Sequence, residues 1–225
     1  MSTKDELKLI KFGKESSDPL LSGVNKLADA VAVTMGPMGM NVLIETLQGH
    51  PIVTKDGVTV AKSVKVKDSS ENLGIEVVRE AASRTADTAG DGTTTATVLA
   101  RSIFSEGLKM IAAGYPAKEI VEGIKISSSD VIKFISNASR PVEKDEEIMS
   151  VATISANGEV EIGELIMSAM NSLGTSGIIT VEEAKGFKSD LLIVEGLQIN
   201  RGYLSPYFVN NTEKMTAEFE NPRIL

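Results

Sequence analysis

The sequence predicts a multidomain protein, mainly α-helical up to about Pro141 and mixed α/β beyond it. Three observations lead to this fold class. Apolar residues recur at helical spacing in long stretches before Pro141, and glycine or proline ends each stretch. After Pro141 the helical stretches become shorter, and runs rich in β-branched residues follow them. We therefore expect a domain boundary near residues 138–142, and a weaker one near residue 194.

The first helix is predicted over residues 18–35. Asp18 suits an N-cap position and Pro19 suits the first helical turn. The apolar stripe that follows consists of Leu20, Val24, Leu27, Ala28 and Val31. Gly36-Pro37 should end this helix. A short strand is expected over residues 41–45, and a turn over residues 55–57.

Three further long helices follow before the texture changes. One apolar stripe runs from Leu73 to near Ala89, and a second runs from Val98 until Gly114 ends it. Pro116 opens the next helix, which should end before Pro141. Beyond it, two shorter helices are expected on either side of Asn157-Gly158. Residues 177–182 and 191–195 are predicted to form a β-hairpin.

Composition excludes several classes of protein. Asp plus Glu total 31 against 23 Lys plus Arg, a net charge of −8, whereas binding to a nucleic-acid backbone requires clustered cations. The chain has no cysteine, which excludes disulfides and zinc–thiolate sites. It also lacks an apolar run of about 18 residues and an apolar segment typical of a signal peptide. We expect a cytoplasmic protein with no membrane or nucleic-acid partner.

The most informative motif is Gly-Asp-Gly-Thr-Thr-Thr at residues 90–95, which lies between two predicted helices. Unpaired N–H groups at a helix start favour an anion, and glycines let a ligand approach the backbone. The threonine hydroxyls could donate to phosphate oxygens, and Asp91 could hold Mg²⁺. An ordinary interhelical turn with capping Asp and Thr is the alternative. Three β-branched threonines are poor helix formers, however, which favours another role.

Two other glycine turns add to this motif. Residues 34–39, Thr-Met-Gly-Pro-Met-Gly, could clasp a phosphate or could simply end a helix. In residues 54–57, Thr-Lys-Asp-Gly, the carboxylate could orient water or a cation, although Asp-Gly turns are common. With two carboxylates and no Cys or His cluster, the three turns together favour a nucleotide and a hard metal ion.

At this point the sequence resembles the GroEL-type (group I) chaperonins. The three motifs are similar to that family's nucleotide-site signatures in order and spacing, and the similarity spans nearly the whole chain. It continues through residues 153–157, 177–182, 194–196 and 201–208. The motif at residues 90–95 is shared with the wider chaperonin superfamily, whereas residues 201–208 are typical of the bacterial and organellar branch.

The resemblance implies a role for individual residues. Asp91 would ligate Mg²⁺, and Gly92, Thr93, Thr94 and Thr95 would hold the phosphates of ATP. Met35, Gly36 and Pro37 would line the nucleotide pocket, while Thr34 and Lys55 would lie near the phosphates and a K⁺ ion. Asp56 would be the catalytic carboxylate. Tyr203, Tyr207 and Phe208 would contact non-native polypeptide, although without the resemblance a place in a core would be the simpler interpretation.

The resemblance also implies the architecture. Residues 1–138 would form half of an equatorial ATP-binding domain, residues 139–194 an α/β intermediate hinge domain, and residues 195–225 the start of an apical α/β domain. The whole protein would be an ATP hydrolase that forms a homo-oligomeric ring and works with a GroES-like co-chaperonin on unfolded polypeptides.

Two departures from the family pattern matter. Met38 and Met40 stand where the family usually has basic residues, so contacts made there by cations are in doubt. A family member is also more than twice as long, so we expect a partial sequence that leaves faces of its long helices exposed and does not turn over ATP normally by itself. A nucleotide-independent interaction module and an unrelated nucleotide-dependent enzyme are the competing hypotheses.

Overall fold

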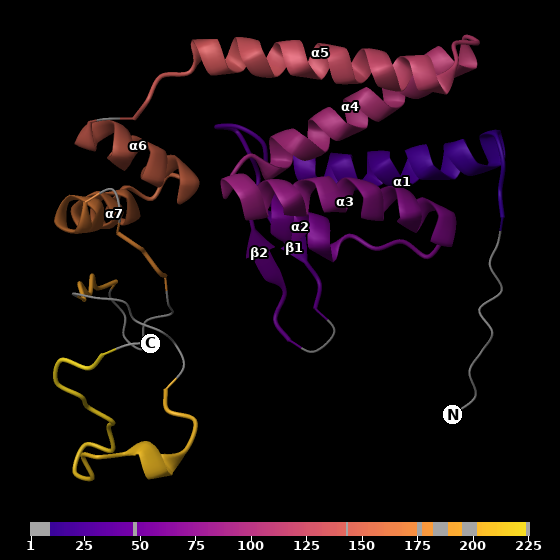
Figure 1. The fold of residues 1–225 in the computed structure, drawn as a ribbon. Helices are drawn as coiled ribbons and strands as arrows, with labels where there is room; N and C mark the ends of the chain where they lie inside the picture. The colour runs from indigo at the N-terminus through magenta and orange to yellow at the C-terminus, as the bar shows by residue number, and fades with distance from the viewer. Residues whose placement is uncertain are drawn as a thin grey trace, which may run out of the picture. The chain divides into compact units, whose positions relative to one another are not determined.

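The chain divides into two units, Met1–Val142 and Glu143–Leu225, which are described separately. The computed structural model describes residues 10–46, 49–142, 144–174, 177–181, 189–194 and 202–223. In the first unit the elements are α1 (Lys14–Ala32), β1 (Val42–Ile44), β2 (Ile52–Thr54), α2 (Gly57–Ser63), α3 (Ser69–Ala89), α4 (Thr93–Ala112) and α5 (Ala117–Ala138) (Figure 1). In the second they are α6 (Asp145–Ser155), α7 (Val160–Leu173) and the short 3₁₀ helix η1 (Pro206–Phe208).

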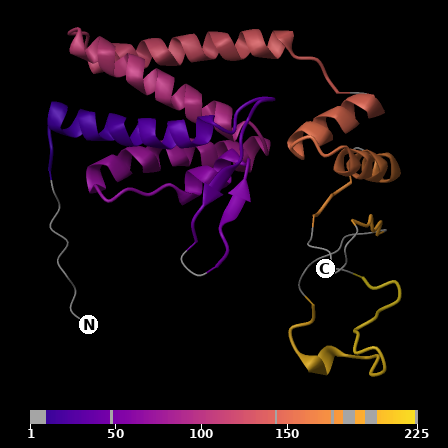
Figure 2. The ribbon, with the colours of Figure 1, turned by 180° about the vertical axis from the view of Figure 1, so that it is seen from behind.

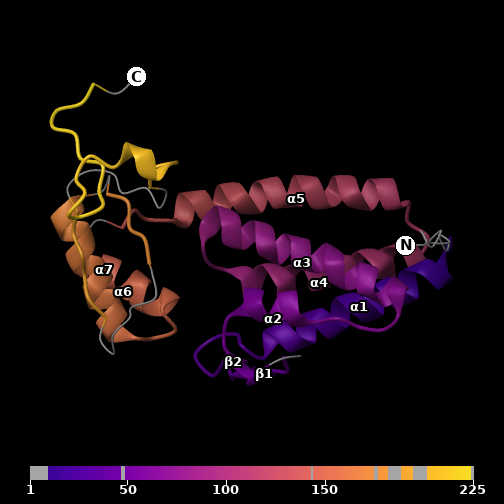
Figure 3. The ribbon, with the colours of Figure 1, turned by 90° about the horizontal axis from the view of Figure 1, so that it is seen from below.

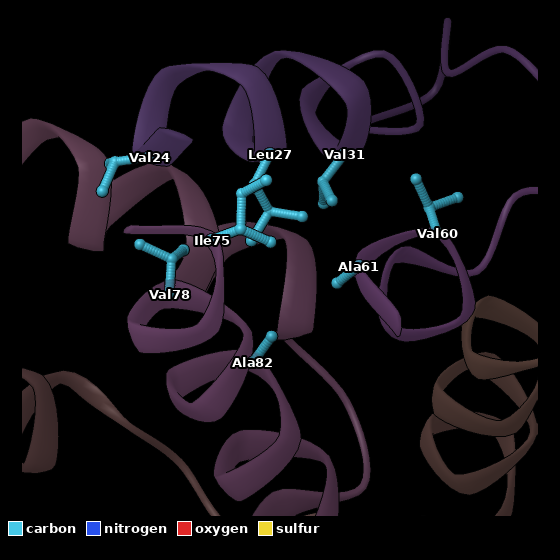
Figure 4. Close-up of a cluster of buried hydrophobic side chains, with 8 residues drawn as sticks. All are labelled: Val24, Leu27, Val31, Val60, Ala61, Ile75, Val78 and Ala82. Carbon is cyan, nitrogen blue, oxygen red and sulfur yellow. The ribbon is translucent and has the colours of Figure 1, made fainter. Parts of the chain in front are cut away.

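The core of the first unit lies where α1, α2 and α3 meet, and α4 covers it. Figure 4 shows its eight buried side chains, which are Val24, Leu27, Val31, Val60, Ala61, Ile75, Val78 and Ala82. Ala100 and Phe104 of α4 pack against this cluster. The helices α1 and α3 approach closely, since a Cβ at Gly74 would lie 2.2 Å from the carbonyl oxygen of Leu20. The stripe predicted for α1 supplies Val24, Leu27 and Val31 to this core. In α3 only part of the predicted stripe is buried, since Val78 enters the core while Leu73 and Val77 are 61% and 68% exposed.

Helix α1 begins four residues earlier than the sequence suggested. It starts at Lys14, so Pro19 lies inside the helix and Asp18 is not its N-cap. Gly13, with φ of 56°, occupies the N-cap position, and no side chain caps this end. The prediction was wrong because the apolar stripe begins only at Leu20, while the polar turn before it adds length without periodicity.

The strands β1 and β2 form an antiparallel hairpin that pairs Val42 with Thr54, Leu43 with Val53 and Ile44 with Ile52. Figure 2 shows this hairpin from behind, extending away from the helices of the first unit. The strand β2 leads directly into α2, which the sequence did not predict. Asp56 is the N-cap of this short helix and accepts hydrogen bonds from the backbone N–H groups of Val58 and Thr59.

Helix α5 differs from the other long helices because it buries none of its residues. It packs only lightly against α4, and Figure 3 shows it along the outer edge of the first unit. Ile132 and Phe134 are 60% and 73% exposed. The predicted exposure of a long helix face is thus confirmed. Among the described residues, no helix is long and apolar enough to cross a membrane.

In the second unit, Gly163 and Ala169 of α7 are buried, and α6 and α7 pack against each other. Asn157 and Gly158, both with positive φ, form the predicted turn between them. Residues 177–181 and 191–194 carry no strand, so the predicted hairpin is wrong as far as these residues are described; residues 182 and 195 lie outside the description. The physical reason is that a two-stranded hairpin without further strands or a packed face is only marginally stable.

Candidate functional site

The loop between α3 and α4 presents Asp91 between two left-handed glycines. Gly90 ends α3 with φ of 74° and donates its N–H to the carbonyl oxygen of Ala86, at 2.9 Å. Gly92 is the N-cap of α4 with φ of 82°, and it donates its N–H to Oδ1 of Asp91, at 2.6 Å. Both φ values favour glycine. The carboxylate of Asp91 is consequently held at the surface beside the start of α4.

The start of α4 has no side-chain cap, in contrast to α2 and α3. Its first three positions are Thr93, Thr94 and Thr95, and the N–H groups of a first helical turn have no intrahelical acceptor. These groups and the positive end of the helix dipole favour an anionic ligand. Thr93 is buried, with 8% of its surface exposed, whereas Thr95 is exposed to solvent. The structure thus leaves unpaired donors next to an exposed carboxylate.

The second glycine turn docks onto this helix start. Gly57, the first residue of α2, is buried, and a Cβ at this position would lie 2.3 Å from Oγ1 of Thr94. Only glycine permits so close an approach without a shift of the backbone or of Thr94. The position of Gly57 brings Asp56 to the same end of the unit as Thr93 and Thr94.

The carboxylate of Asp56 has a fixed orientation. Its Oδ2 accepts hydrogen bonds from the backbone N–H of Thr59, at 2.9 Å, and from the Thr59 hydroxyl, while Oδ1 accepts a longer one of 3.3 Å from Val58. The N–H of Asp56 donates to Oγ1 of Thr54, at 3.0 Å. Because each carboxylate oxygen can accept about two hydrogen bonds, Oδ1 can accept another from water.

The third turn also reaches Thr94. The hydroxyl of Thr34 donates to the carbonyl oxygen of Val31, at 2.8 Å, and lies 3.3 Å from Oγ1 of Thr94. The predicted residues Met35, Gly36 and Pro37 follow it and are exposed, with Gly36 at φ of 75°. A hydrogen bond from Met40 to the carbonyl oxygen of Val33, at 2.8 Å, closes this loop. All three glycine turns therefore converge on the first turn of α4.

The donor set suits a phosphate ligand with a hard metal ion. In the described part of the chain, no three Asp, Glu, His or Cys side chains gather into a metal site. A cation here would take one carboxylate from the protein, with the remaining ligands coming from phosphate oxygens or water, as Mg²⁺ does at many nucleotide sites. Lys55 is exposed and forms no ion pair among the described residues.

The other predicted binding residues belong to the second unit. Tyr203, Tyr207 and Phe208 are 44%, 99% and 59% exposed, so within this unit they do not form a core. The hydroxyl of Tyr203 makes a long hydrogen bond of 3.4 Å to the carbonyl oxygen of Met215. Met38 and Met40, which follow the Gly-Pro turn, are 91% and 63% exposed.

Two supporting residues were not predicted from the sequence. Thr59 orients the Asp56 carboxylate through its backbone and its hydroxyl. Thr97 is fully buried one turn below Thr93 and donates its hydroxyl to the Thr93 carbonyl oxygen, at 2.8 Å. The available signal was Asp56 itself, because aspartate is among the residues preferred at the N-cap of a helix.

Comparison with known proteins finds similarity to chaperonins both in sequence and in structure. The model of the TCP-1/cpn60 chaperonin family matches residues 27–225. The crystal structure of the chaperonin gp146 from the bacteriophage EL 2 (Pseudomonas aeruginosa), in presence of ATP-BeFx, is 28% identical with a TM-score of 0.69, and the match covers 88% of this chain and 35% of that one. A group III chaperonin in the open state is 24% identical with a TM-score of 0.60, over 72% of this chain and 32% of that one, which supports the fold.

The chain spans about a third of the length of both solved chaperonins. The family model covers residues 27–225, which is nearly all of this chain. This match shows that the chain belongs to the TCP-1/cpn60 chaperonin family.

Proposed function

We propose that this chain forms the nucleotide-binding part of an ATP-dependent chaperonin subunit. The observation that carries the proposal is the convergence of three glycine turns on the uncapped start of α4, where Gly57 and Thr34 both approach Thr94. The gp146 crystals, which contained an ATP analogue, support a nucleotide as the ligand.

Each part of the site has a distinct role in this proposal. Backbone N–H groups and hydroxyls at Gly92, Thr93, Thr94 and Thr95 bind the phosphates, and Asp91 holds Mg²⁺, which neutralises phosphate charge. The exposed turn of Met35, Gly36 and Pro37 lines the nucleotide pocket. A K⁺ ion on the same side would take oxygen ligands, so Thr34 suits it through its hydroxyl and Lys55 only through its backbone carbonyl.

Hydrolysis would transfer the terminal phosphoryl group to water. A bond forms between the water oxygen and the γ-phosphorus, while the bond from that phosphorus to the bridging oxygen breaks, leaving ADP and phosphate. Oδ1 of Asp56 orients the water and accepts its proton. Thr59 holds this carboxylate in place, because its backbone and hydroxyl occupy the other oxygen.

The whole subunit would then use this ATPase cycle to assist the folding of unfolded polypeptides in a homo-oligomeric ring in the cytoplasm. We propose residues 1–138 as equatorial, 139–194 as intermediate and 195–225 as apical. Exposed Tyr203, Tyr207 and Phe208 support a role in binding apolar segments of clients. The motif at residues 201–208 favours the group I branch, and with it a GroES-like co-chaperonin.

Calorimetric titration of Mg-ATP into the complete chaperonin polypeptide that contains these residues tests the proposal. We expect Asp91→Ala to abolish measurable binding. Asp130→Ala is the matched control, because Asp130 is an exposed aspartate of α5 whose pair with Lys133 lies away from the three turns. Unchanged affinity in Asp91→Ala, or equal loss in both variants, would refute the site.

A further inference from the structure

Arg79 of α3 forms a bridge to the end of α2. Its Nε donates to the carbonyl oxygen of Ala61, at 2.9 Å, and its Nη2 donates to that of Val64, at 2.5 Å. Nη1 donates to Oε1 of Glu76, at 2.6 Å. The side chain is only 14% exposed. Since the last carbonyl groups of a helix lack intrahelical donors, Arg79 supplies a C-terminal cap to α2 from another helix.

The helix that Arg79 caps carries Asp56 at its other end. Helix α2 has seven residues, Gly57–Ser63, and a helix this short is not stable by itself. Its start rests on Thr93 and Thr94 through Gly57, and Val60 and Ala61 enter the core. At about 1.5 Å per residue it is a rod of about 10 Å, so a shift at one end is transmitted to the other.

The helix that carries Arg79 leads to the other carboxylate of the site. Helix α3 runs on from Arg79 to Ala89, and Gly90 then delivers Asp91. The two hydrogen bonds to Ala61 and Val64 therefore tie the helix that holds Asp56 to the helix that leads to Asp91. The residues proposed to bind phosphate and Mg²⁺ lie on α4 and its preceding loop, so they do not depend on α2 in the same way.

We propose that Arg79 is a positioning residue for hydrolysis, which fixes Asp56 relative to Asp91 by anchoring the end of α2. This inference rests on the function proposed above. It predicts a separation of two properties: loss of Arg79 leaves Mg-ATP binding intact and slows the chemical step. A merely structural role would lower stability and binding together, without that separation.

The test compares four forms of the complete chaperonin polypeptide: the unchanged protein, Arg79→Met, Arg79→Lys and Arg84→Met. Arg84 is the matched control, because it lies on the same helix, is 79% exposed and pairs with Glu80. Steady-state ATPase kinetics give kcat and KM, and calorimetry gives Kd for Mg-ATP. For Arg79→Met we expect kcat to fall about tenfold or more, since small misplacements of a catalytic group are costly, with Kd within about twofold.

The remaining variants sharpen the result. Lys keeps the charge but cannot bond both carbonyls in the fixed geometry of a guanidinium, so we expect Arg79→Lys to recover part of kcat. Arg84→Met should match the unchanged protein.

An unchanged kcat in Arg79→Met, or a Kd that rises as much as kcat falls, would overturn the positioning role. If the Met variant does not fold, the Lys variant decides: a lowered kcat with unchanged Kd supports the role, and a full kcat overturns it. Failure of the unchanged protein to bind Mg-ATP would instead refute the proposed function.

Discussion

Helices α3 and α4 follow one another in the chain, yet they begin in opposite ways. At the start of α3, Asp68 accepts hydrogen bonds from the N–H groups of Ser70 and Glu71, both at 2.9 Å. At the start of α4, a glycine and three threonines provide no side-chain cap. The first arrangement satisfies the helix internally, whereas the second leaves donors for another molecule. In the function proposed above, the capped start of α3 serves stability and the uncapped start of α4 serves binding.

Exchanging the two aspartates for alanine gives the largest expected effect. Asp91→Ala should weaken Mg-ATP binding by at least about a hundredfold, because a lost carboxylate–metal contact is worth several kcal/mol, and should leave the melting temperature almost unchanged. Asp68→Ala should lower the melting temperature and leave the affinity for Mg-ATP unchanged. Calorimetry and thermal unfolding of both variants measure this; two variants with the same profile would erase the distinction between the helix starts.

Gly57→Ala should have the next largest effect, because it forces the starts of α2 and α4 apart. The new Cβ would lie 2.3 Å from Oγ1 of Thr94, and overpacking of this kind costs about 1–3 kcal/mol. Chemical denaturation should show that loss together with weaker nucleotide binding. Gly123→Ala in α5 is the control, since nothing lies within 4 Å of its Cβ position and the change should be neutral or slightly stabilising.

Asp68→Ala should cost about 0.5–2 kcal/mol of stability, the usual range for a lost N-cap. Unfolding by urea, with the midpoint and slope both measured, gives this value directly. An Asp68→Asn variant should retain most of the stability because its side-chain oxygen can still accept from the helix. If Ala and Asn were equally destabilising, the charge and not the cap would be responsible.

The smallest expected effect is a dependence of stability on acidic pH. Hydrogen bonds from Lys26 and Ser22 lower the pKa of Glu71, and the backbone N–H groups of Glu71 and Ser70 lower the pKa of Asp68. A carboxyl group with a lowered folded pKa stabilises the protein above its unfolded pKa, and this contribution is lost as pH falls through the folded pKa. Melting temperatures measured from neutral pH downward should therefore fall, less steeply in Glu71→Gln than in the control Glu122→Gln.

The sequence predicted the long helices because apolar residues recur in them at helical spacing. This periodicity identified the helices but not their burial, since α1 supplies the core and α5 buries none of its residues. It did not predict α2, because seven residues are too few for a periodic stripe and the Asp-Gly pair at its start is typical of turns. The hairpin predicted after α7 is wrong where it is described, since β-branched composition alone supplies no partner strand.

The candidate site could be predicted from the sequence only in part, because local patterns reveal turns but not how they pack together. Local motifs identified the three turns, and each glycine pattern suggested an approachable backbone. Their convergence on Thr94, however, depends on the packing of α1, α2 and α4, which residue patterns do not determine. Arg79 was not predicted because its partners are backbone carbonyls 18 and 15 residues away, and a carbonyl leaves no mark in a sequence.

Hydrogen exchange at single amides, with and without Mg-ATP, tests the central claim most directly in the complete chaperonin polypeptide. The N–H groups of Thr93, Thr94 and Thr95 should exchange fast without nucleotide and be strongly protected once it binds. The N–H groups of Ser70 and Glu71, already bonded to Asp68, should change little. If Mg-ATP binds and the three threonine amides remain unprotected, the start of α4 is not the phosphate site.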